Sequence, residues 1–357
     1  MSSLKAGHSL GLLLAVVFLS ARPAGAANVA VTLTDAPAST FAQQAGLDVA
    51  ALRTQIEAEM NNLFQTYRVS DYLRSFGNAQ SFATRGMGVD YGSAFDLFTL
   101  GFAGSLALNL DEGFRPENLK SDPAFSGAST NFTVMAGVSL SKFGLPLAFY
   151  GNYFSRETDI DEFTADLHNW GFHAQLRLFE PDSNGLLGVF LHWGGLHLTT
   201  GLEYAKTTMT LAGAWVRTLP VTAPAATMAS VRISAVGGMA VESSTLSIPL
   251  EITTNLRLLS ILSLYGGLGF DLQLGGKSEL VANLNGTMTG VVPGQDPAPI
   301  GTAVVTATDA ADPSTGRLRW LLGVQVNVLV VKLFAQLNLA AQDPVLASVA
   351  LGARVAF

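Results

Sequence analysis

The sequence predicts an all-β fold: a closed, antiparallel, up-and-down transmembrane β-barrel of about 12 strands, within a range of about 10 to 14, with a short N-terminal helical segment. Three observations support this prediction. Only 13% of the 357 residues are charged and the mean hydropathy is +0.35, which is unusually apolar for a protein surrounded by water. After the N-terminal leader, no stretch approaches the roughly 20 apolar residues that a spanning helix needs. Many segments instead alternate apolar and polar residues, as half-buried strands do.

Residues 1–26 predict a secretory signal peptide that is removed on export by the Sec pathway. Lys5 supplies a positive charge near its start. Leu10–Leu19 is a ten-residue apolar stretch, which is too short to span a bilayer as a helix. Residues 24–26 (Ala-Gly-Ala) provide a small-residue cleavage site. An uncleaved membrane anchor is the alternative interpretation.

Residues 27–94 form the predicted N-terminal segment, which is either periplasmic or a plug and contains one helix. Apolar residues recur with helical spacing after Asp48, a residue type that commonly caps helix N-termini. Packing of this helix against one end of the barrel is one interpretation, and a plug in the lumen is the other. The Gly-rich stretch 77–92 that follows is irregular. The helical stripe consists of Val49, Leu52, Ile56, Met60, Leu63 and Tyr67.

Residues 95–357 form the predicted barrel. In its last strand, Val349, Leu351, Val355 and Phe357 share one face. In a membrane barrel this apolar face contacts lipid and the polar face lines the interior. A soluble β-sandwich would pack the apolar faces together, but the alternating segments are longer than most strands of globular sheets. Aromatic residues near predicted strand ends, which suit the lipid–water interface, are Trp170, Trp193, Tyr150 and Tyr153.

The connections between the predicted strands divide into short and long ones, as in up-and-down barrels. We interpret the short connections, such as 141–144 and 254–257, as periplasmic turns. We interpret the long polar or Gly- and Pro-rich connections as external loops. The predicted external loops are 111–130, 156–168, 217–230, 286–301 and 308–316.

Charged residues of both signs fall on the faces that would point into the barrel. In a wide pore they would set ion selectivity through the local electric field. In a narrow barrel they would instead pair and brace the wall. A charge on the lipid face would cost roughly 2–4 kcal/mol at the bilayer midplane, which favours the inward assignment. The predicted lumen-lining residues are Arg177, Glu203, Glu251, Asp271, Lys332 and Arg354.

The composition argues against several other kinds of protein. A net charge of −7 is opposite to that of a nucleic-acid-binding protein. The absence of cysteine excludes disulfides and thiolate metal sites. His192 and His197 are five residues apart, so on a strand they would face opposite sides and could not bind one metal ion. We therefore predict no cofactor, no metal site, no catalytic residues and no enzymatic activity; a barrel-embedded lipid hydrolase is a less favoured alternative.

The final nine residues, Val349–Phe357 (VALGARVAF), together with the signal and the alternating segments, resemble bacterial outer-membrane β-barrel proteins. In that class, a terminal Phe preceded by apolar residues at every second position is the pattern recognised by the barrel assembly machinery. Here Val349, Leu351, Val355 and Phe357 match it. The resemblance implies residence in the outer membrane of a Gram-negative bacterium, with lipid and the assembly machinery as partners. The stretch NAQSFATRGMGVDYG is also loosely similar to the N-terminal hatch of long-chain fatty-acid transport channels, although their Asn-Pro-Ala motif is absent.

Two functions are compatible with these features. The first is a channel or transporter for small or apolar solutes, for which a small molecule would be the partner. The second is a structural or adhesive barrel whose external loops bind a partner. Conductance measurements would separate the two.

Overall fold

The computed structural model describes residues 28–66, 69–92, 96–110, 127–179, 190–222, 229–259, 261–341 and 345–357. The predicted signal peptide and most of the predicted loop 111–130 lie outside these residues. The described chain forms one antiparallel sheet of 12 strands, accompanied by three α-helices. The strands are β1 (Asn28–Leu33), β2 (Phe98–Leu110), β3 (Gly127–Ser139), β4 (Leu147–Ile160), β5 (Phe163–Phe179), β6 (Leu191–Pro220), β7 (Ser230–Leu258), β8 (Leu262–Val291), β9 (Ala298–Ala311), β10 (Gly316–Val328), β11 (Val331–Ala340) and β12 (Val345–Ala356).

Ten of the 12 strands close into a ring. The order β8-β10-β11-β12-β2-β3-β4-β5-β6-β7 returns to β8 through the β7–β8 pairing, and each neighbouring pair is antiparallel. Both β9 and β10 pair with β8: β9 along residues 278–290 and β10 along residues 262–272. Together they form one interrupted path of chain antiparallel to β8. The path is interrupted at 312–315, where Pro313 cannot donate a ladder hydrogen bond. The predicted all-β closed barrel is therefore confirmed.

The side chains of the ring alternate as a membrane barrel requires, with apolar residues outside and polar residues inside. Phe102, Trp320 and Leu351 point outward and are 53% to 63% exposed. Gln325 and Asn338 point inward and are fully buried. Among the described residues, no helix is both long and apolar enough to cross a bilayer.

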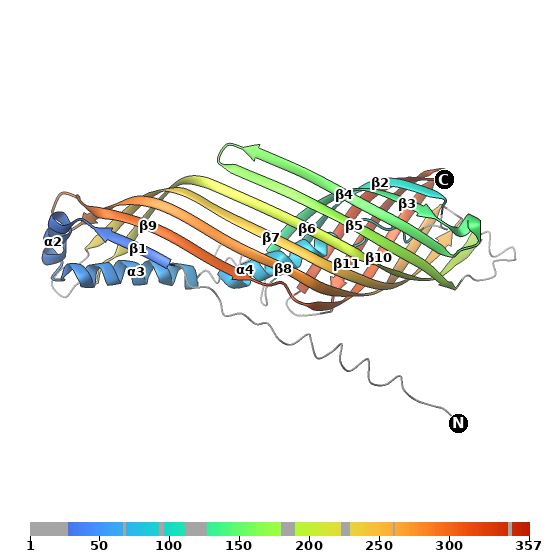
Figure 1. The fold of residues 1–357 in the computed structure, drawn as a ribbon, viewed down its shortest axis with the longest axis horizontal. Helices are drawn as coiled ribbons and strands as arrows, with labels where there is room; N and C mark the ends of the chain where they lie inside the picture. Colours follow the sequence, from blue (N-terminus) through green and yellow to red (C-terminus); the bar gives the residue numbers. More distant parts are fainter. Residues whose placement is uncertain are drawn as a thin grey trace, which may run out of the picture.

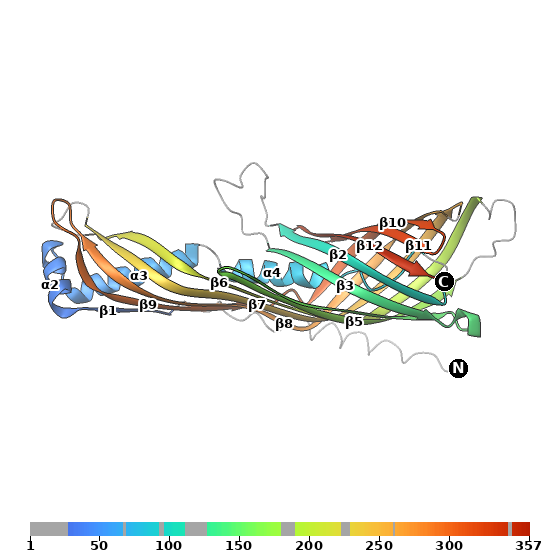
Figure 2. The same cartoon turned by 90° about the horizontal axis from the view of Figure 1, so that it is seen from above.

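Three strands continue far beyond the ring. β6 has 30 residues, which at about 3.3 Å per residue cover about 100 Å, whereas a membrane strand needs only roughly 9–11 residues. Beyond the ring, β6, β7 and β8 pair with one another, β9 adds to β8, and β1 adds to β9. We call this five-stranded sheet the extension; Figures 1 and 2 show it projecting from one end of the barrel.

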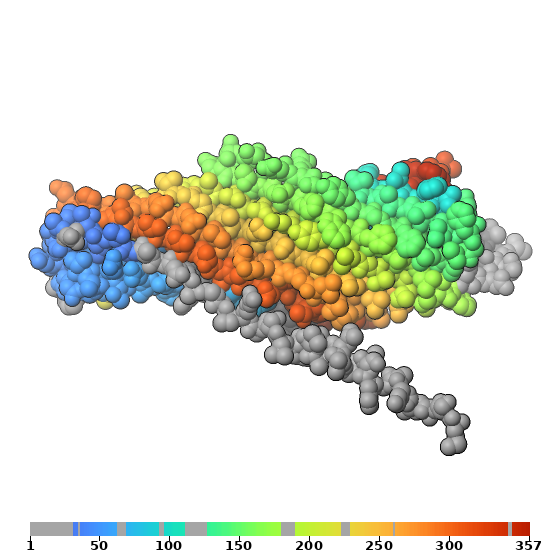
Figure 3. Space-filling view, in the orientation of Figure 1, coloured from blue at the N-terminus to red at the C-terminus, as the bar shows by residue number. Residues whose placement is uncertain are grey.

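Two helices, α2 (Asp35–Gln44) and α3 (Val49–Thr66), cover one face of the extension. Phe41 of α2 and Leu52 and Ile56 of α3 are buried against residues of the sheet that include Ile233 and Val305. Figure 2 shows α3 running along the sheet, and Figure 3 shows the helices in blue at the far end of the molecule. The extension is thus a helix-on-sheet layer with its own apolar core.

The outward face of the extension is mostly polar, with exposed valines such as Val236 and Val304 between the polar residues, whereas the outward face of the ring is apolar. Asn283 of β8 and Thr306 of β9 are exposed there. The change occurs at a group of aromatic side chains in which the rings of Trp170 and Tyr204 stack at 5.8 Å. Such rings suit the lipid–water interface.

A surface ion pair lies directly beyond these aromatic rings. Lys206 Nζ is 2.8 Å from Glu242 Oε1, and this hydrogen bond raises the pKa of Lys206. Charged side chains at this position would be costly in hydrocarbon. The pair therefore marks the water side of the boundary between ring and extension.

Several details of the N-terminal segment differ from the sequence prediction. α3 coincides with the predicted helix, and the Ala51 amide donates to Asp48 Oδ1 at 2.6 Å, as expected of an N-cap. The segment contains three helices, however, where one helix was predicted. The third helix is α4 (Val69–Ala83).

Several predictions about the barrel wall are wrong. The predicted turn 254–257 lies within β7, which runs to Leu258, and the predicted loops 286–301 and 308–316 begin inside β8 and β9. The predicted external loop 156–168 is a continuous hairpin, because β4 runs to Ile160 and β5 starts at Phe163. The polar residues of this hairpin stand beyond the lipid boundary, so their composition resembles that of a loop. Tyr150, predicted at the interface, is instead buried inside the ring.

Candidate functional site

The inside of the ring is filled by α4 and the residues that follow it. Every residue from Phe76 to Gly92 is buried, and α4 contacts strands on several sides of the ring. Small residues allow this close approach: a Cβ on Gly77 would lie 2.6 Å from Ser278 Oγ of β8. We call residues 69–92 the plug. Figure 1 shows α4 inside the strands.

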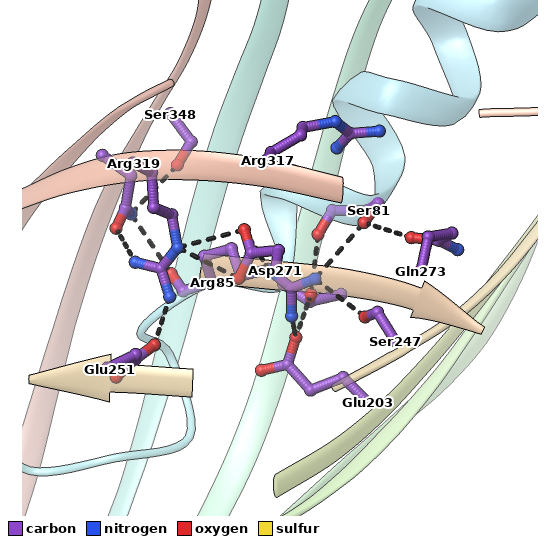
Figure 4. A network of polar contacts seen from close by, with 12 residues as sticks. Ser81, Arg85, Glu203, Ser247, Glu251, Asp271, Gln273, Arg317, Arg319 and Ser348 are labelled. Carbon is purple, nitrogen blue, oxygen red and sulfur yellow. Dashed lines mark hydrogen bonds and ion pairs between the residues drawn. The ribbon is translucent and has the colours of Figure 1, made fainter. Parts of the chain in front are cut away.

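Arg85, two residues after α4, is the centre of a buried polar network. Its guanidinium pairs with Glu203 of β6, and its Nε is 3.1 Å from Asp271 Oδ2 of β8. Its Nη2 donates to Ser247 Oγ of β7 at 2.7 Å. None of the three charged side chains is more than 4% exposed. Figure 4 shows them converging from the plug and three strands. Buried charges of this kind are stable only when paired.

Arg319 of β10 continues the network around the wall. Its Nε is 3.1 Å from Asp271 Oδ2, and its Nη2 pairs with Glu251 of β7. Its Nη1 donates to Asn338 Oδ1 at 2.8 Å. The plug contributes Tyr91, whose hydroxyl donates to Glu251 Oε2 at 2.6 Å. The wall and the plug therefore share the same hydrogen-bond partners.

A second cluster holds the end of the plug. Asp90 Oδ1 is 3.1 Å from Arg354 Nη1 of β12, and Asp90 Oδ2 is 3.6 Å from Lys332 Nζ of β11. Lys332 also pairs with Asp96, just before β2. Arg354 Nη2 donates to the backbone carbonyl of Val89 at 2.6 Å. The last two strands of the chain thus bind the plug directly.

The charges of the lumen nearly balance: five buried positive groups face four buried carboxylates and Asp96, whose side chain is 29% exposed. Arg317, near the extension end, donates to the Asn78 side chain of the plug and adds a fifth positive group. A nearly balanced interior lacks the excess of one sign that gives a pore its ion selectivity. The positive residues are Arg85, Arg317, Arg319, Lys332 and Arg354, and the negative residues are Asp90, Asp96, Glu203, Glu251 and Asp271.

The plug packs closely against the wall at Gln80 and Gly86. A crevice between Gln80 of the plug, Asn131 of β3 and Lys206 of β6 has room for about one water molecule. Gly86 shows how tight the fit is. Its φ of +77° suits glycine, and a Cβ there would lie 1.7 Å from Gln336 Nε2 of β11.

The structure places five of the six predicted lumen-lining residues in these two groups of buried charges. Glu203, Glu251 and Asp271 belong to the network around Arg85 and Arg319, and Lys332 and Arg354 belong to the second cluster. Arg177 points inward but is only half-buried, near the end of β5 away from the extension.

Sequence reasoning missed Arg85, Asp90 and Arg319. Arg319 could have been found, because the alternation of β10 extends back through Leu318 and Trp320 to the inward Arg317 and Arg319. Arg85 and Asp90 lie in an irregular stretch that carries no periodic signal.

The predicted assembly-signal residues lie on the outer surface. Val349, Leu351 and Val355 of β12 and the terminal Phe357 are all exposed. The backbone of Phe357 bonds with that of Phe98 in both directions, at 2.9 and 3.1 Å, so the C-terminus pairs with the start of the ring. The tight turn at 329–330 and the last pair between β7 and β8, Leu258 with Leu262, lie at this same end, opposite the extension.

A closed antiparallel ring with an apolar belt outside, a polar interior and a terminal strand ending in Phe defines an outer-membrane β-barrel, and the protein resides in the outer membrane. The family model described as Lsa36-like matches residues 26–357, and the chain belongs to this family. No curated protein matches the sequence.

Solved outer-membrane barrels are similar to this chain at low sequence identity. The translocator domain of the autotransporter NalP from Neisseria meningitidis has a TM-score of 0.33 and 12% identity, covering 79% of this chain and 94% of that domain. The attachment invasion locus protein Ail of Yersinia pestis has a TM-score of 0.23 and 14% identity, covering 73% and 96%. The Ralstonia pickettii toluene transporter TbuX has a TM-score of 0.23 and 8% identity, covering 79% and 93%.

Proposed function

We propose that this protein is a plugged outer-membrane barrel that anchors a surface-exposed extension, and that the extension binds an extracellular partner. The single observation that carries the proposal is the filled lumen. Residues 76–92 are buried within the ring and fixed to its wall by paired charges. A barrel whose interior is occupied in this way works as an anchor and not as an open pore.

The proposed orientation follows from the ends of the strands. Phe357 and the tight turn at 329–330 lie at the end of the ring opposite the extension. In outer-membrane barrels, short turns face the periplasm and long connections face the outside. The extension, with α2 and α3, then stands outside the cell. Its mostly polar outward face is consistent with contact with water.

A solute channel is the second candidate, and it requires the plug to leave the lumen. The crevice beside Gln80 is the observation that favours it, since it lies between the plug and the wall. Displacing the plug would expose the carboxylates of Glu203 and Asp271 without Arg85. This loss of pairing supports the anchor over the channel.

The orientation is tested by labelling single cysteines on intact cells, because the natural chain contains no cysteine. Asn283→Cys lies on the polar face of the extension, and Lys142→Cys lies in the turn between β3 and β4. We expect a membrane-impermeant maleimide to label the first variant on intact cells and the second only after the outer membrane is permeabilised. The reverse pattern would contradict the proposal.

Planar-bilayer recording tests the closed lumen. We expect the folded protein to insert without discrete conductance steps, with folding verified by its resistance to unfolding in cold detergent. Discrete steps from the unmodified protein would favour the channel.

A further inference from the structure

One edge of the extension has no neighbouring strand among the described residues. β5 accompanies β6 only as far as the pair Phe163 and Leu211, where the β4–β5 hairpin turns. Beyond that point Ala212–Pro220 pairs with β7 on one side alone. We call these residues the β6 edge. In Figure 1 it borders the extension on the side opposite to β1.

The backbone groups of the β6 edge point alternately toward β7 and away from it. The Ala212 amide bonds away from β7, to the Glu162 carbonyl at 2.8 Å, whereas the Val221 amide bonds on the β7 side, to Ala229 at 2.9 Å. Ala214, Val216 and Thr218 share the direction of Ala212. No described backbone or side-chain group bonds to the outward amides and carbonyls of Ala214, Val216 and Thr218.

Two other free edges of the same sheet are covered by side chains. On β1, the outward carbonyl of Val31 accepts hydrogen bonds from Arg53 Nε and Nη2 of α3, at 2.9 and 2.6 Å. On β3, the outward carbonyl of Phe132 accepts from Asn169 Nδ2 of β5 at 2.8 Å. Natural proteins block exposed edges because they pair with other chains. Residues 214–218 of the β6 edge have no such cap; the nearest one is Gln55 Nε2 of α3, which donates to the carbonyl of Thr222, beyond the β6 edge, at 2.9 Å.

The charge near the β6 edge indicates the chemistry of a partner. Arg217 lies on the edge itself, and Arg232 lies opposite Thr218 on β7; both are exposed. Segments 212–220 and 230–238 contain no acidic residue, although the whole chain has a net charge of −7. Because Thr218 pairs with Arg232, Arg217 and Arg232 point to opposite faces of the sheet.

We propose that the β6 edge binds an extended segment of another protein as an added antiparallel strand, with two consecutive acidic side chains that reach Arg217 on one face and Arg232 on the other. Strand addition of this kind takes its affinity from main-chain hydrogen bonds and its specificity from alternate side chains. The inference rests on the proposed function for the location of the partner outside the cell. It deepens that function by naming the class of partner.

The binding test uses the full-length mature protein in detergent micelles and a defined probe. The probe is a fluorescein-labelled peptide of alternating Val and Thr with Asp-Glu at its centre, followed by fluorescence anisotropy. A second peptide has the same sequence with N-methyl groups on the alternate amides that face the edge. We expect saturable binding of the first peptide and a loss of affinity of about tenfold or more for the second, since N-methylation removes main-chain donors.

Two sets of variants test the site. Val216→Pro removes an outward amide and breaks no bond to β7, so it should abolish binding while the protein remains folded. Val216→Thr keeps the amide and is the matched control, with binding unchanged. The double variant Arg217→Glu with Arg232→Glu should lose the acidic probe and bind a probe with Lys-Lys at its centre.

Three outcomes would overturn the proposal. Equal binding of the methylated and unmethylated peptides would show that main-chain pairing is not used. Absence of binding to the acidic probe at millimolar concentration would show that extended acidic segments are not the partners of the β6 edge. If sedimentation shows that the protein dimerises and that Val216→Pro abolishes the dimer, the partner of the β6 edge is a second copy of this chain and not a peptide segment of another protein. Peptide binding in micelles does not depend on membrane orientation, so the cysteine labelling can fail or succeed independently.

Discussion

Replacing Arg85 by methionine tests whether paired charges hold the plug in the barrel. The variant Arg85→Met keeps most of the side-chain volume but removes the guanidinium from between Glu203 and Asp271. Asp271 retains Arg319 at 3.1 Å. Glu203 keeps the neutral Thr84 hydroxyl and the His173 ring, 3.4 Å away, as its remaining partners. The unpaired charge therefore falls mainly on Glu203.

The expected cost follows from the burial of this pair. Breaking a buried ion pair by removing one partner costs about 3–5 kcal/mol. Since Asp271 remains paired, we expect Arg85→Met to lower the free energy of unfolding by about 3 kcal/mol, at the lower end of that range. The double variant Arg85→Met with Glu203→Met removes both charges, so its cost should be smaller than that of Arg85→Met alone.

The matched control is Arg74→Met on α4. Arg74 is 3.8 Å from Asp71, and the two side chains are 54% and 39% exposed, so its loss should cost no more than about 1 kcal/mol. The assay is reversible denaturant unfolding of the protein in lipid vesicles, followed by tryptophan fluorescence. Two results would show that paired charges do not hold the plug. One is that Arg85→Met and Arg74→Met lower the free energy of unfolding equally. The other is that the loss in the double variant equals the sum of the losses caused by Arg85→Met and Glu203→Met alone.

Three further substitutions probe other parts of the structure with the same unfolding assay. Gly86→Ala should destabilise the protein by about 2 kcal/mol or more, because its Cβ would meet Gln336 and its φ is +77°; Gln336→Ala in the same chain should recover part of this loss. Leu329→Gly should raise the free energy of unfolding by about 1 kcal/mol, since Leu329 has a φ of 56° and an exposed side chain; a loss of stability would contradict this. Leu351→Arg should cost about 2–4 kcal/mol if the outward face of β12 contacts lipid, and a neutral effect would refute that contact.

The ring could be predicted from the sequence because one physical cause acts on all its strands. Lipid outside and polar contacts inside impose the same alternation on every strand, as in Val349, Leu351 and Val355. The pattern is local and needs no knowledge of which strands are neighbours. The same alternation assigned inward positions to Glu203 and Asp271, because an outward charge would be costly in hydrocarbon.

The extension could not be predicted from this alternation. Its outward face meets water, so residues such as Asn283 and Thr306 replace the apolar row and the segment resembles a loop. Its inward face is apolar because α2 and α3 cover it, a long-range contact that composition does not reveal. Pro313 further divides the return path of β9 and β10, which obscures its length.

The partners of the plug were hidden for a different reason. Arg85 and Asp90 lie in an irregular stretch, and each finds its partner on a strand more than 100 residues further along the chain. Which charges pair depends on the order of strands around the ring. A single sequence does not encode that order in any local pattern.

The plug and the closure of the ring depend on each other. The plug, residues 69–92, enters the ring from the extension, and Phe98 lies at the opposite end, so the chain crosses from one end of the ring to the other before β2 begins. Balanced ion pairs from several strands would have to break for the plug to enter a closed ring, so we expect it to dock before or during closure.

β12 takes part both in the closure of the ring and in the docking of the plug. It pairs with β2 to join the first and last strands of the ring, and Arg354 lies at this junction opposite Gly101. A Cβ on Gly101 would lie 2.8 Å from Arg354 Cγ, so glycine lets the arginine side chain pass into the lumen. There Arg354 binds Asp90 and the carbonyl of Val89. A ring closed without the plug would leave this guanidinium without its carboxylate at the junction itself, and docking of the plug therefore stabilises the pairing of β12 with β2.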